Sequence, residues 1–479
     1  MEMIMYMWLW IAGLLTIAIA CNAWHSLERL KSMKLGIPDG SMGWPIVGET
    51  YEYFACHASI NPDPFVSLRR KKYGNIFRTH LLGSPTICSV DPDFNKFVLQ
   101  NEGVLFVSRY PRAIRYLFGD GCILNATGEM HKKLKPKAVA FMQIGKLKDL
   151  FRDSVELNVL KTLSTWKDRT VILTEEAALM EFNIIAQMLL SIMPGEAKTS
   201  RFDLMAENVN LLGGILSKFQ LNLPGTAYGR AVKARQRIHH YISELIEERQ
   251  RKPSDSYDDF LSLVLKENED SASGLQLSRE QLIDFVLSIL VAGCDIPANL
   301  FTMAIKYLTE CPQALKELKD EHDKIREQKQ SGEKLTWDDY RSMTFTQDVF
   351  NESLRLSSLV HGLYRKSLKD INYKGMTIPR NWTVLLYTRG VHLSEKFFEE
   401  PLRFNPWRWQ DKTIKERHFL GFGAGLRHCP GSELGRLELA FFLHHLVTKF
   451  RWEPAQADYP TYMPVTRMVK GFPIRVKQL

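Results

Sequence analysis

A long hydrophobic run covers residues 282–308, and polar residues interrupt it at only a few positions. Asp284, Asp295 and Asn299 lie inside the run, and Pro297 stands near its middle. A helix that spans a bilayer rarely carries such groups, whereas a helix through a protein core can pair them with neighbouring side chains. The run therefore predicts a long core helix.

A second apolar run, residues 3–24, contains no charge and is long enough to cross about 30 Å of hydrocarbon as a helix. The cations that follow it would leave the rest of the chain in the cytosol by the positive-inside rule; they are Arg29, Lys31 and Lys34. A cleaved signal peptide is the alternative, because Ala18-Ile19-Ala20 resembles a cleavage site. No basic segment precedes the run, so we expect a transmembrane anchor.

The rest of the pattern is mostly helical, with β-branched residues and turn punctuation at 75–90 and 371–387. We therefore expect a mostly α fold with a small β region. No obvious linker divides the body of the chain. The predicted domains are an anchor at 1–24, a basic and Pro/Gly-rich hinge at 25–48, and a single body at 49–479.

Composition supports a globular body, with 45% hydrophobic and 24% charged residues. The net charge is +9, but the basic residues are interspersed with nearly as many acids and form no tail. This distribution argues against nucleic-acid binding and favours a local basic docking patch. The seven cysteines show no C-x-x-C spacing, which indicates neither a zinc knuckle nor a disulfide framework.

The segment FGAGLRHCPG at 422–431 carries the most specific chemistry. Its fixed positions match the haem-binding signature F-x-x-G-x-R-x-C-x-G of the cytochrome P-450 superfamily, which the chain resembles; they are Phe422, Gly425, Arg427, Cys429 and Gly431. The resemblance implies a haem b whose iron takes the Cys429 thiolate as axial ligand. Arg427 would pair with a haem propionate, and the glycines would let the backbone approach the sulfur.

Two further motifs support the resemblance. The superfamily has a buried triad of one Glu and two Arg, and here Glu352 and Arg355 in ESLR and Arg408 in FNPWRW match it. In GEMHKKLK, His131 and Lys135 stand where the family contacts the propionates. A solvated basic helix is the alternative for this segment.

Pro136 follows Lys135 directly and departs from the continuous helix of the family, so we expect an interruption there. Lys133 and Lys137 add positive charge beside it. The resemblance implies that such a basic face docks an acidic reductase.

The resemblance covers residues 35–479, and the chain looks most like the plant sterol and brassinosteroid hydroxylases. It implies the cytochrome P-450 fold, with 49–479 as the haem-thiolate catalytic domain. The implied enzyme is a monooxygenase of the endoplasmic reticulum membrane that takes NADPH electrons through NADPH–cytochrome reductase. Its substrate would be an apolar polycyclic sterol or steroid. A triterpenoid or diterpenoid oxidase, a haem-thiolate isomerase or cyclase, and a non-catalytic haem protein remain alternatives.

The segment VAGCDIPANL matches the family pattern A-G-x-[Asp/Glu]-Thr except at its last position, where Ile296 replaces the threonine. Ala292 and Gly293 would make room for dioxygen, and Asp295 would draw protons inward, with a pKa raised by burial. Pro297 has no N–H, which leaves the Gly293 carbonyl free to hold a water. A simple kink is the alternative. Without the threonine, either a substrate hydroxyl completes the proton relay or the enzyme rearranges its substrate instead.

By resemblance, segments 108–122, 359–364 and 462–468 would line the substrate pocket with the central helix. The candidate pocket residues, each of which also suits an ordinary core role, are Tyr116, Phe118, Phe285, Ile289, Ala292, Ile296, Val360, His361 and Val465. His361 would bond a steroid hydroxyl, with a solvent-facing side chain as the alternative. The segment 219–225 would dip into the membrane lipid.

Overall fold

The computed structural model describes much of the chain outside its N-terminus. The described residues are 23, 26–27, 30, 33–44, 47–57, 63–194, 203–215, 217, 221–251, 257–270, 274–330, 332–411, 414, 418–462 and 465–479. The predicted anchor lies outside them apart from Ala23. The chain forms two compact units: one contains the residues up to Arg109 with Gly362–Val391, and the other contains Tyr110–His361 with His392–Leu479. A single domain over 49–479 stays a prediction.

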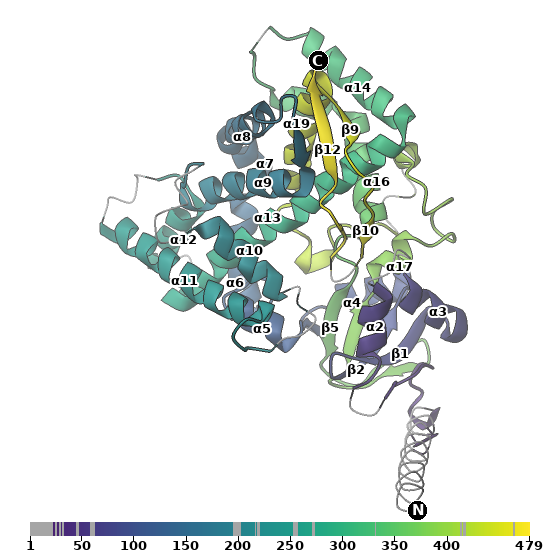
Figure 1. Ribbon diagram of the computed structural model, residues 1–479. Helices are drawn as coiled ribbons and strands as arrows, with labels where there is room; N and C mark the ends of the chain where they lie inside the picture. Colours follow the sequence, from purple (N-terminus) through teal and green to yellow (C-terminus); the bar gives the residue numbers. More distant parts are fainter. Residues whose placement is uncertain are drawn as a thin grey trace, which may run out of the picture. The chain divides into compact units, whose positions relative to one another are not determined.

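The first unit is built on a five-stranded mixed sheet in the order β1-β2-β8-β5-β3 (Figure 1). The strands are β1 (Ile76–Leu81), β2 (Ser84–Ser89), β3 (Phe106–Ser108), β5 (Leu363–Ser367) and β8 (Thr383–Leu386). β2 pairs with β1 antiparallel and with β8 in parallel, so segments from both ends of the chain meet in one sheet. A small hairpin joins β6 (Ile371–Tyr373) to β7 (Met376–Ile378). The strands predicted at 75–90 and 371–387 are confirmed.

Three helices of this unit begin before or between the strands: α2 (Thr50–His57), α3 (Pro64–Tyr73) and α4 (Pro92–Gln100). The short α17 (Thr388–His392) follows β8. The start of α4 follows directly from its sequence. Asp91 accepts a hydrogen bond from the N–H of Phe94 (2.9 Å), and Pro92 occupies the first helical turn, where its missing N–H costs nothing.

The second unit is mostly helical. Its helices are α5 (Arg112–Phe118), α6 (Gly128–Phe141), α7 (Ile144–Lys146), α8 (Arg152–Ser164), α9 (Leu173–Leu190), α10 (Leu204–Ile215), α11 (Ala227–Arg251), α12 (Phe260–Glu269), α13 (Arg279–Glu310), α14 (Pro312–Glu327), α15 (Trp337–Ser342), α16 (Thr344–Ser357) and α19 (Ser432–Lys449). Its short strands are β4 (Thr170–Ile172), β9 (Phe450–Pro454), β10 (Pro460–Thr461), β11 (Arg467–Met468) and β12 (Pro473–Gln478). β12 pairs with β4 and β9, and β10 pairs with β11.

The core of the second unit surrounds α13, as its mixed sequence predicts. Ser278 and Gln281 form the capping box that opens the helix. Among the described residues, α13 is the one helix long and apolar enough to cross a bilayer, and 72% of its most apolar window is buried inside the protein. It packs along α9 and stacks Phe301 on Phe442 of α19, with ring centroids 5.3 Å apart. Helix α13 is therefore a core helix.

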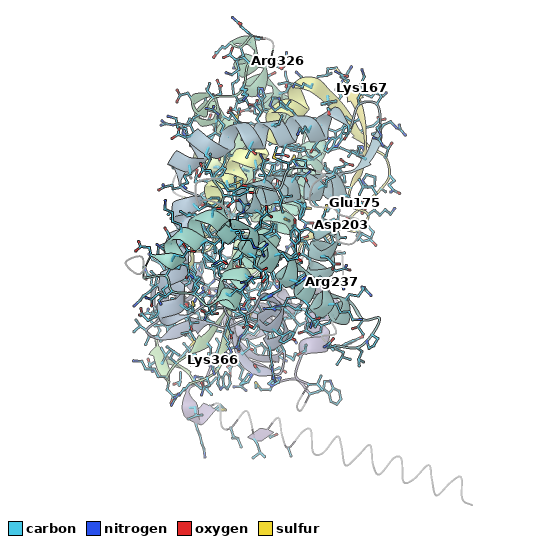
Figure 2. All side chains as sticks on the ribbon, turned by 90° about the vertical axis from the view of Figure 1, so that its left-hand side faces the viewer. Lys167, Glu175, Asp203, Arg237, Arg326 and Lys366 are labelled. Carbon is cyan, nitrogen blue, oxygen red and sulfur yellow. The ribbon has the colours of Figure 1, made fainter. Side chains whose placement is uncertain are left out.

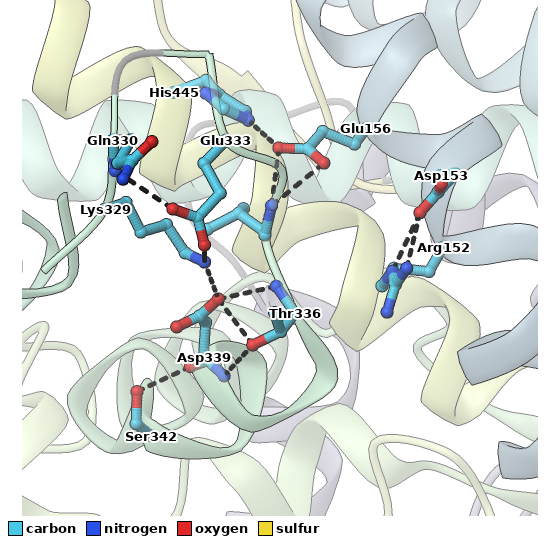
Figure 3. A network of polar contacts seen from close by, with 11 residues as sticks. Arg152, Asp153, Glu156, Lys329, Gln330, Glu333, Thr336, Asp339, Ser342 and His445 are labelled. Atoms are coloured by element: carbon cyan, nitrogen blue, oxygen red, sulfur yellow. Dashed lines mark hydrogen bonds and ion pairs between the residues drawn. The ribbon is translucent and has the colours of Figure 1, made fainter.

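Polar groups in the second unit lie both at its surface and in buried networks. Charged side chains such as Glu175, Arg237 and Arg326 lie at its surface (Figure 2). A buried network ties the connection before α15 to α8 and α19 (Figure 3). Within it, Glu156 accepts from the N–H of Leu335 (3.2 Å) and pairs with Nε2 of His445 (2.9 Å). This network fixes helix α19, which begins directly after the cysteine segment.

Candidate active site

Cys429 lies in a tight loop that leads into α19. The loop turns twice through the left-handed region, at Gly423 (φ 69°) and Gly425 (φ 65°), where a side chain would be strained. The N–H of Cys429 then donates to the carbonyl of Phe422 (3.0 Å) and closes the loop. Helix α19 begins at Ser432, so its positive N-terminal end lies beside the cysteine. The sequence spacing thus builds a rigid cradle for one sulfur atom.

Two cations flank this loop. Lys135 on α6 donates from Nζ to the carbonyl of His428, the residue before the cysteine. Arg427 donates from Nη2 to the carbonyl of Ala126 (2.6 Å), which ties the loop to the segment before α6. His131, one turn before Lys135, is buried. These contacts exclude a merely solvated helix for α6.

Helix α6 runs without a break through Pro136, so the expected interruption is wrong. A proline inside a helix removes the hydrogen bond to the carbonyl four residues back, here that of Lys132, and its ring crowds that carbonyl. The buried residues Leu134, Ala138 and Phe141 on both sides of Pro136 pack against the core and hold the helix together. Lys135 therefore keeps its helical position and reaches the cysteine loop.

The surroundings of Cys429 act on its thiol in opposite directions. Burial raises the pKa of Cys429, because the thiolate loses its hydration. The N–H of Gly431 and the charge of Lys135 lower the pKa again. Burial likewise lowers the pKa of Lys135. The loop thus offers a protected sulfur with a hydrogen-bond donor and a cation ready to stabilise its anionic form.

Glu352, Arg355 and Arg408, the predicted triad, form a buried network between α16 and the 3-10 turn Pro406–Gln410. Glu352 accepts from Nη2 of Arg355 (2.8 Å) and from Nε of Arg408 (3.1 Å), and all three side chains are buried. Glu352 also accepts from the indole N–H of Trp409 (3.0 Å). Arg355 in turn donates to the carbonyls of His392 and Pro401. The triad thus organises several chain segments at once.

His392 connects the triad to the cysteine loop, and the sequence reasoning missed it. The Ser358 hydroxyl donates to the carbonyl of Arg355, so it accepts from Nδ1–H of His392 (3.0 Å). Nε2 of His392 then accepts from the N–H of Leu420 (3.0 Å), two residues before Phe422. No spacing rule marks His392, because its role depends on a contact between distant segments.

Helix α13 carries an accessible stretch in the middle of an otherwise buried sequence. Residues 292, 293 and 295–297 are partly or fully accessible, while most of the helix around them is buried. Burial raises the pKa of Asp295, as predicted, and the positive charge of Arg467 on β11 opposes this shift. The helix passes through Pro297 without a break. Gly293 also has a packing role, because an added Cβ would lie 2.7 Å from Ile185 on α9.

Comparison with known proteins decides the family. The family model for Cytochrome P450 matches residues 38–472. The chain belongs to the cytochrome P450 family. It is 40% identical to an abietadienol/abietadienal oxidase of Pinus taeda over 93% of this chain and 91% of that protein. It is 38% identical to a cholesterol 22-hydroxylase (CYP90B27) of Paris polyphylla over 98% and 97% of the two chains. A steroid (22S)-hydroxylase of Oryza sativa is also 38% identical over 94% of this chain and 89% of that protein.

The fold of this P450 agrees with a solved structure of the family. The retinoic acid-bound cyanobacterial CYP120A1 matches with a TM-score of 0.83 at 24% identity, covering 93% of this chain and all of that one. The P450 fold predicted for the body is therefore confirmed. The enzyme is a haem-thiolate monooxygenase whose electrons come from a reductase.

The residues of this P450 fit a haem. The loop offers one soft thiolate donor, and Lys135 and Arg427 beside it are suited to the acidic propionates. Cys429 would be the axial ligand, and the Gly431 N–H would tune its charge. That Phe422, Gly425, Gly431, His131, Lys135 and Arg427 contact the cofactor stays a prediction.

The predicted pocket residues of this P450 lie in different surroundings. Phe118, Phe285 and Ile289 are buried in the core, and Phe285 packs edge-on against Phe260 with centroids 5.2 Å apart. Such a contact is an ordinary core contact. Their role in the pocket stays a prediction.

The other pocket candidates are more accessible, with one exception. Tyr116 is 58% and Val360 46% exposed, while Val465 is half-buried. Ala292 and Ile296 belong to the accessible stretch of α13. His361 is buried, which excludes the solvent-facing alternative for it.

Proposed function

We propose that this P450 hydroxylates a plant sterol or steroid, of brassinosteroid type or with a cholesterol-derived side chain, that already carries oxygen. The observation that carries the proposal is its likeness, over nearly the whole chain, to a cholesterol 22-hydroxylase and a steroid (22S)-hydroxylase. The accessible part of α13 agrees with it, since apolar positions there stand beside a single acid, Asp295. A steroid buries mostly apolar area with one or two polar anchors.

The chain contributes three functions to the reaction. A bound haem supplies the chemistry of dioxygen activation, and Cys429 would hold it with a thiolate that favours O–O cleavage. Asp295, with its raised pKa, stores and passes a proton from the protein interior toward the accessible stretch. Pro297 has no N–H for the Gly293 carbonyl, which leaves that oxygen free to hold water. Ile296 provides no hydroxyl, so a hydroxyl of the substrate takes that place in the relay.

A diterpenoid oxidase is the second candidate. The oxidase of Pinus taeda is slightly more identical to this chain than the steroid hydroxylases are. The alcohol and the aldehyde in the name of that oxidase also carry oxygen. Both candidates place an oxygenated polycycle in the same pocket, and they differ in the ring system that the pocket accepts.

The partner that delivers NADPH electrons is an NADPH–cytochrome reductase, which we propose docks on the basic face of α6. The exposed Lys132 pairs with Glu129, and Lys137 pairs with Glu267 (2.9 Å). The exposed Lys132–Glu129 pair is weak and open to exchange with acids of a partner, whereas the Lys137–Glu267 pair is more buried. We further propose that residues 1–24 anchor the enzyme in the endoplasmic reticulum membrane by a single pass, with the catalytic domain in the cytosol.

Product mass under labelled dioxygen tests this function. The full-length enzyme is co-expressed with a plant reductase and given sterols, hydroxysterols and diterpene alcohols, with and without NADPH. One labelled oxygen gained only with NADPH supports a monooxygenase, and the accepted ring system separates sterol from diterpenoid. A rearranged product without added oxygen and without NADPH would establish an isomerase or cyclase instead. No turnover of any compound would leave a non-catalytic haem protein.

A further inference from the structure

Two buried polar atoms near Asp295 have no hydrogen-bond partner among the described residues. They are Oδ1 of Asn299 and Nη2 of Arg467. Asn299 lies one turn beyond Asp295 on α13, is only 2% exposed, and donates from Nδ2 to the Asp295 carbonyl (2.7 Å). A buried polar atom without a partner costs roughly 1–3 kcal/mol, so two of them beside one carboxylate call for a polar partner that the described residues do not supply.

Arg467 is held in a fixed position by its own strand. It pairs with Thr461 across the β10–β11 ladder. The preceding residue, Thr466, is fully buried and donates from its hydroxyl to the carbonyl of Ser357 (2.7 Å). β11 packs against α13, so the guanidinium faces the helix that carries Asp295. The pairing with Thr461 and the buried bond of Thr466 leave the backbone of Arg467 little freedom to move away.

Arg467 and Asp295 influence each other without a direct ion pair. Arg467 acts on the charge of Asp295, yet no ion pair within 4.0 Å joins the two side chains in the described part of the chain. One guanidinium nitrogen thus remains free near a carboxylate that it does not touch. A single oxygen atom between them would satisfy both.

The polar atoms around this position select a hydroxyl group. Arg467 can only donate, while Oδ1 of Asn299 and the Asp295 carboxylate accept. A hydroxyl accepts from the first and donates to either of the others. A carboxylate would have no proton to give and would be repelled by Asp295, and an apolar group would leave the guanidinium unpaired. The side chains of Asp295 and Arg467 are both partly accessible, whereas the unpaired Nη2 and the Asn299 Oδ1 are themselves buried.

We propose that Arg467, with Asn299 and Asp295, anchors a hydroxyl group of the substrate and makes Arg467 a specificity-determining residue. This inference rests on the proposed function and narrows its substrate class to a neutral polycyclic alcohol. It also places a substrate hydroxyl where Ile296, unlike the family threonine, supplies none. The anchored substrate oxygen lies beside Asp295, one residue from the position where the family has threonine.

The test measures substrate binding to the full-length haem enzyme through the shift of its Soret band. Two matched sets serve as probes: cholesterol, 5-cholestene and a cholestenoic acid, and abietadienol, abietadiene and abietic acid. We expect the wild type to bind the alcohol of its preferred set about tenfold more tightly than the hydrocarbon, and more tightly than the acid. Arg467→Met should abolish the preference for the alcohol and leave hydrocarbon binding unchanged, while Arg467→Lys should retain part of it.

Arg475→Met is the matched control, because Arg475 lies exposed on β12 and pairs with Glu453 on the surface. It should leave every affinity unchanged. Asn299→Ala provides a second variant in case Arg467→Met does not hold haem, and it should also weaken alcohol binding selectively. An equal affinity of the wild type for alcohol and hydrocarbon, or a preference that survives Arg467→Met with an intact spectrum, overturns the anchor alone. A wild type that binds none of the six compounds overturns the proposed substrate class and the anchor with it.

Discussion

A single buried carboxylate, Glu352, stabilises much of the proximal framework. Its two oxygens accept from Arg355, Arg408, the indole of Trp409 and the N–H of Asn405. The desolvation cost of a buried ion is offset only when every lone pair has a donor, as it has here. The same carboxylate therefore holds α16, the 3-10 turn and, through Arg355 and His392, the cysteine loop.

We expect Glu352→Gln to destabilise the enzyme by about 3–5 kcal/mol, because it leaves two buried guanidinium groups without their counter-charge. Denaturant unfolding followed by the Soret band measures the loss. Glu453→Gln is the control, because Glu453 is 56% exposed in its ion pair and its loss should cost under about 1 kcal/mol. Equal stability of Glu352→Gln and wild type would contradict the role of the network.

Glu181 on α9 and Glu438 on α19 form a second buried acid site, without a basic partner among the described contacts. Burial raises the pKa of Glu438 to about 8 and that of Glu181 well above its usual range, where the neighbouring Glu438 raises it further. Two carboxyl groups that face each other in a core hold a proton between them. The folded protein thus binds protons that the unfolded chain releases.

This pair predicts a pH dependence of stability. Because both pKa values are raised in the folded state, the stabilisation is complete below about pH 4.5 and is lost as pH rises through about 8. We expect Glu438→Gln to flatten the fall in melting temperature of the haem enzyme between pH 5 and 9. Glu310→Gln, on the exposed end of α13, should not change the curve. Parallel curves for Glu438→Gln and wild type would exclude the shared proton.

At the scale of elements, α13 combines a buried helix with a local defect. The helix continues through Pro297, so the cost of the missing N–H is carried by packing on α9 and α19. Pro297 belongs to the accessible stretch that also contains Asp295, so the free Gly293 carbonyl lies where it can bind water. In the described part of α13, the one hydrogen bond lost to an internal proline is therefore the one at the candidate site.

Pro297→Ala should stabilise the enzyme by up to about 3 kcal/mol and lower the share of NADPH electrons that end in product, with more hydrogen peroxide released. The restored N–H would occupy the Gly293 carbonyl and remove the water that it holds. Product formed per NADPH consumed measures the effect. The control is Pro312→Ala in the first turn of α14, where proline replaces no hydrogen bond. Unchanged coupling in a stabilised Pro297→Ala would show that Pro297 only kinks the helix.

Motifs with fixed local spacing were predictable from the sequence, and contacts between distant segments were not. The cysteine loop, the capping box at Ser278 and the cap at Asp91 follow from neighbouring residues alone. His392 and Arg467 were missed, because each acts on a residue that only the fold brings near. Pro136 was misjudged, since a local rule for proline was outweighed by packing on both sides of it.

At the scale of the molecule, the cysteine loop, the triad and the accessible part of α13 all belong to the second compact unit. That unit is assembled from two stretches of chain, Tyr110–His361 and His392–Leu479. None of these candidate site residues comes from the N-terminal segment. The anchor is expected to set location rather than the geometry of the site.

Removal of residues 2–24 should release the enzyme from membranes while its haem spectrum stays unchanged. The uncharged run at 3–24 is long and apolar enough for a stable single-pass insertion. Alkaline extraction of microsomes measures the effect: the full-length protein should stay in the pellet and the truncated protein should appear in the supernatant. If the truncated protein remains in the pellet, the main membrane attachment is through another surface, such as the exposed Leu221 and Leu223. A mature full-length protein that begins after Ala20 would contradict the anchor and establish the signal peptide, since a cleaved segment cannot hold the enzyme in the bilayer.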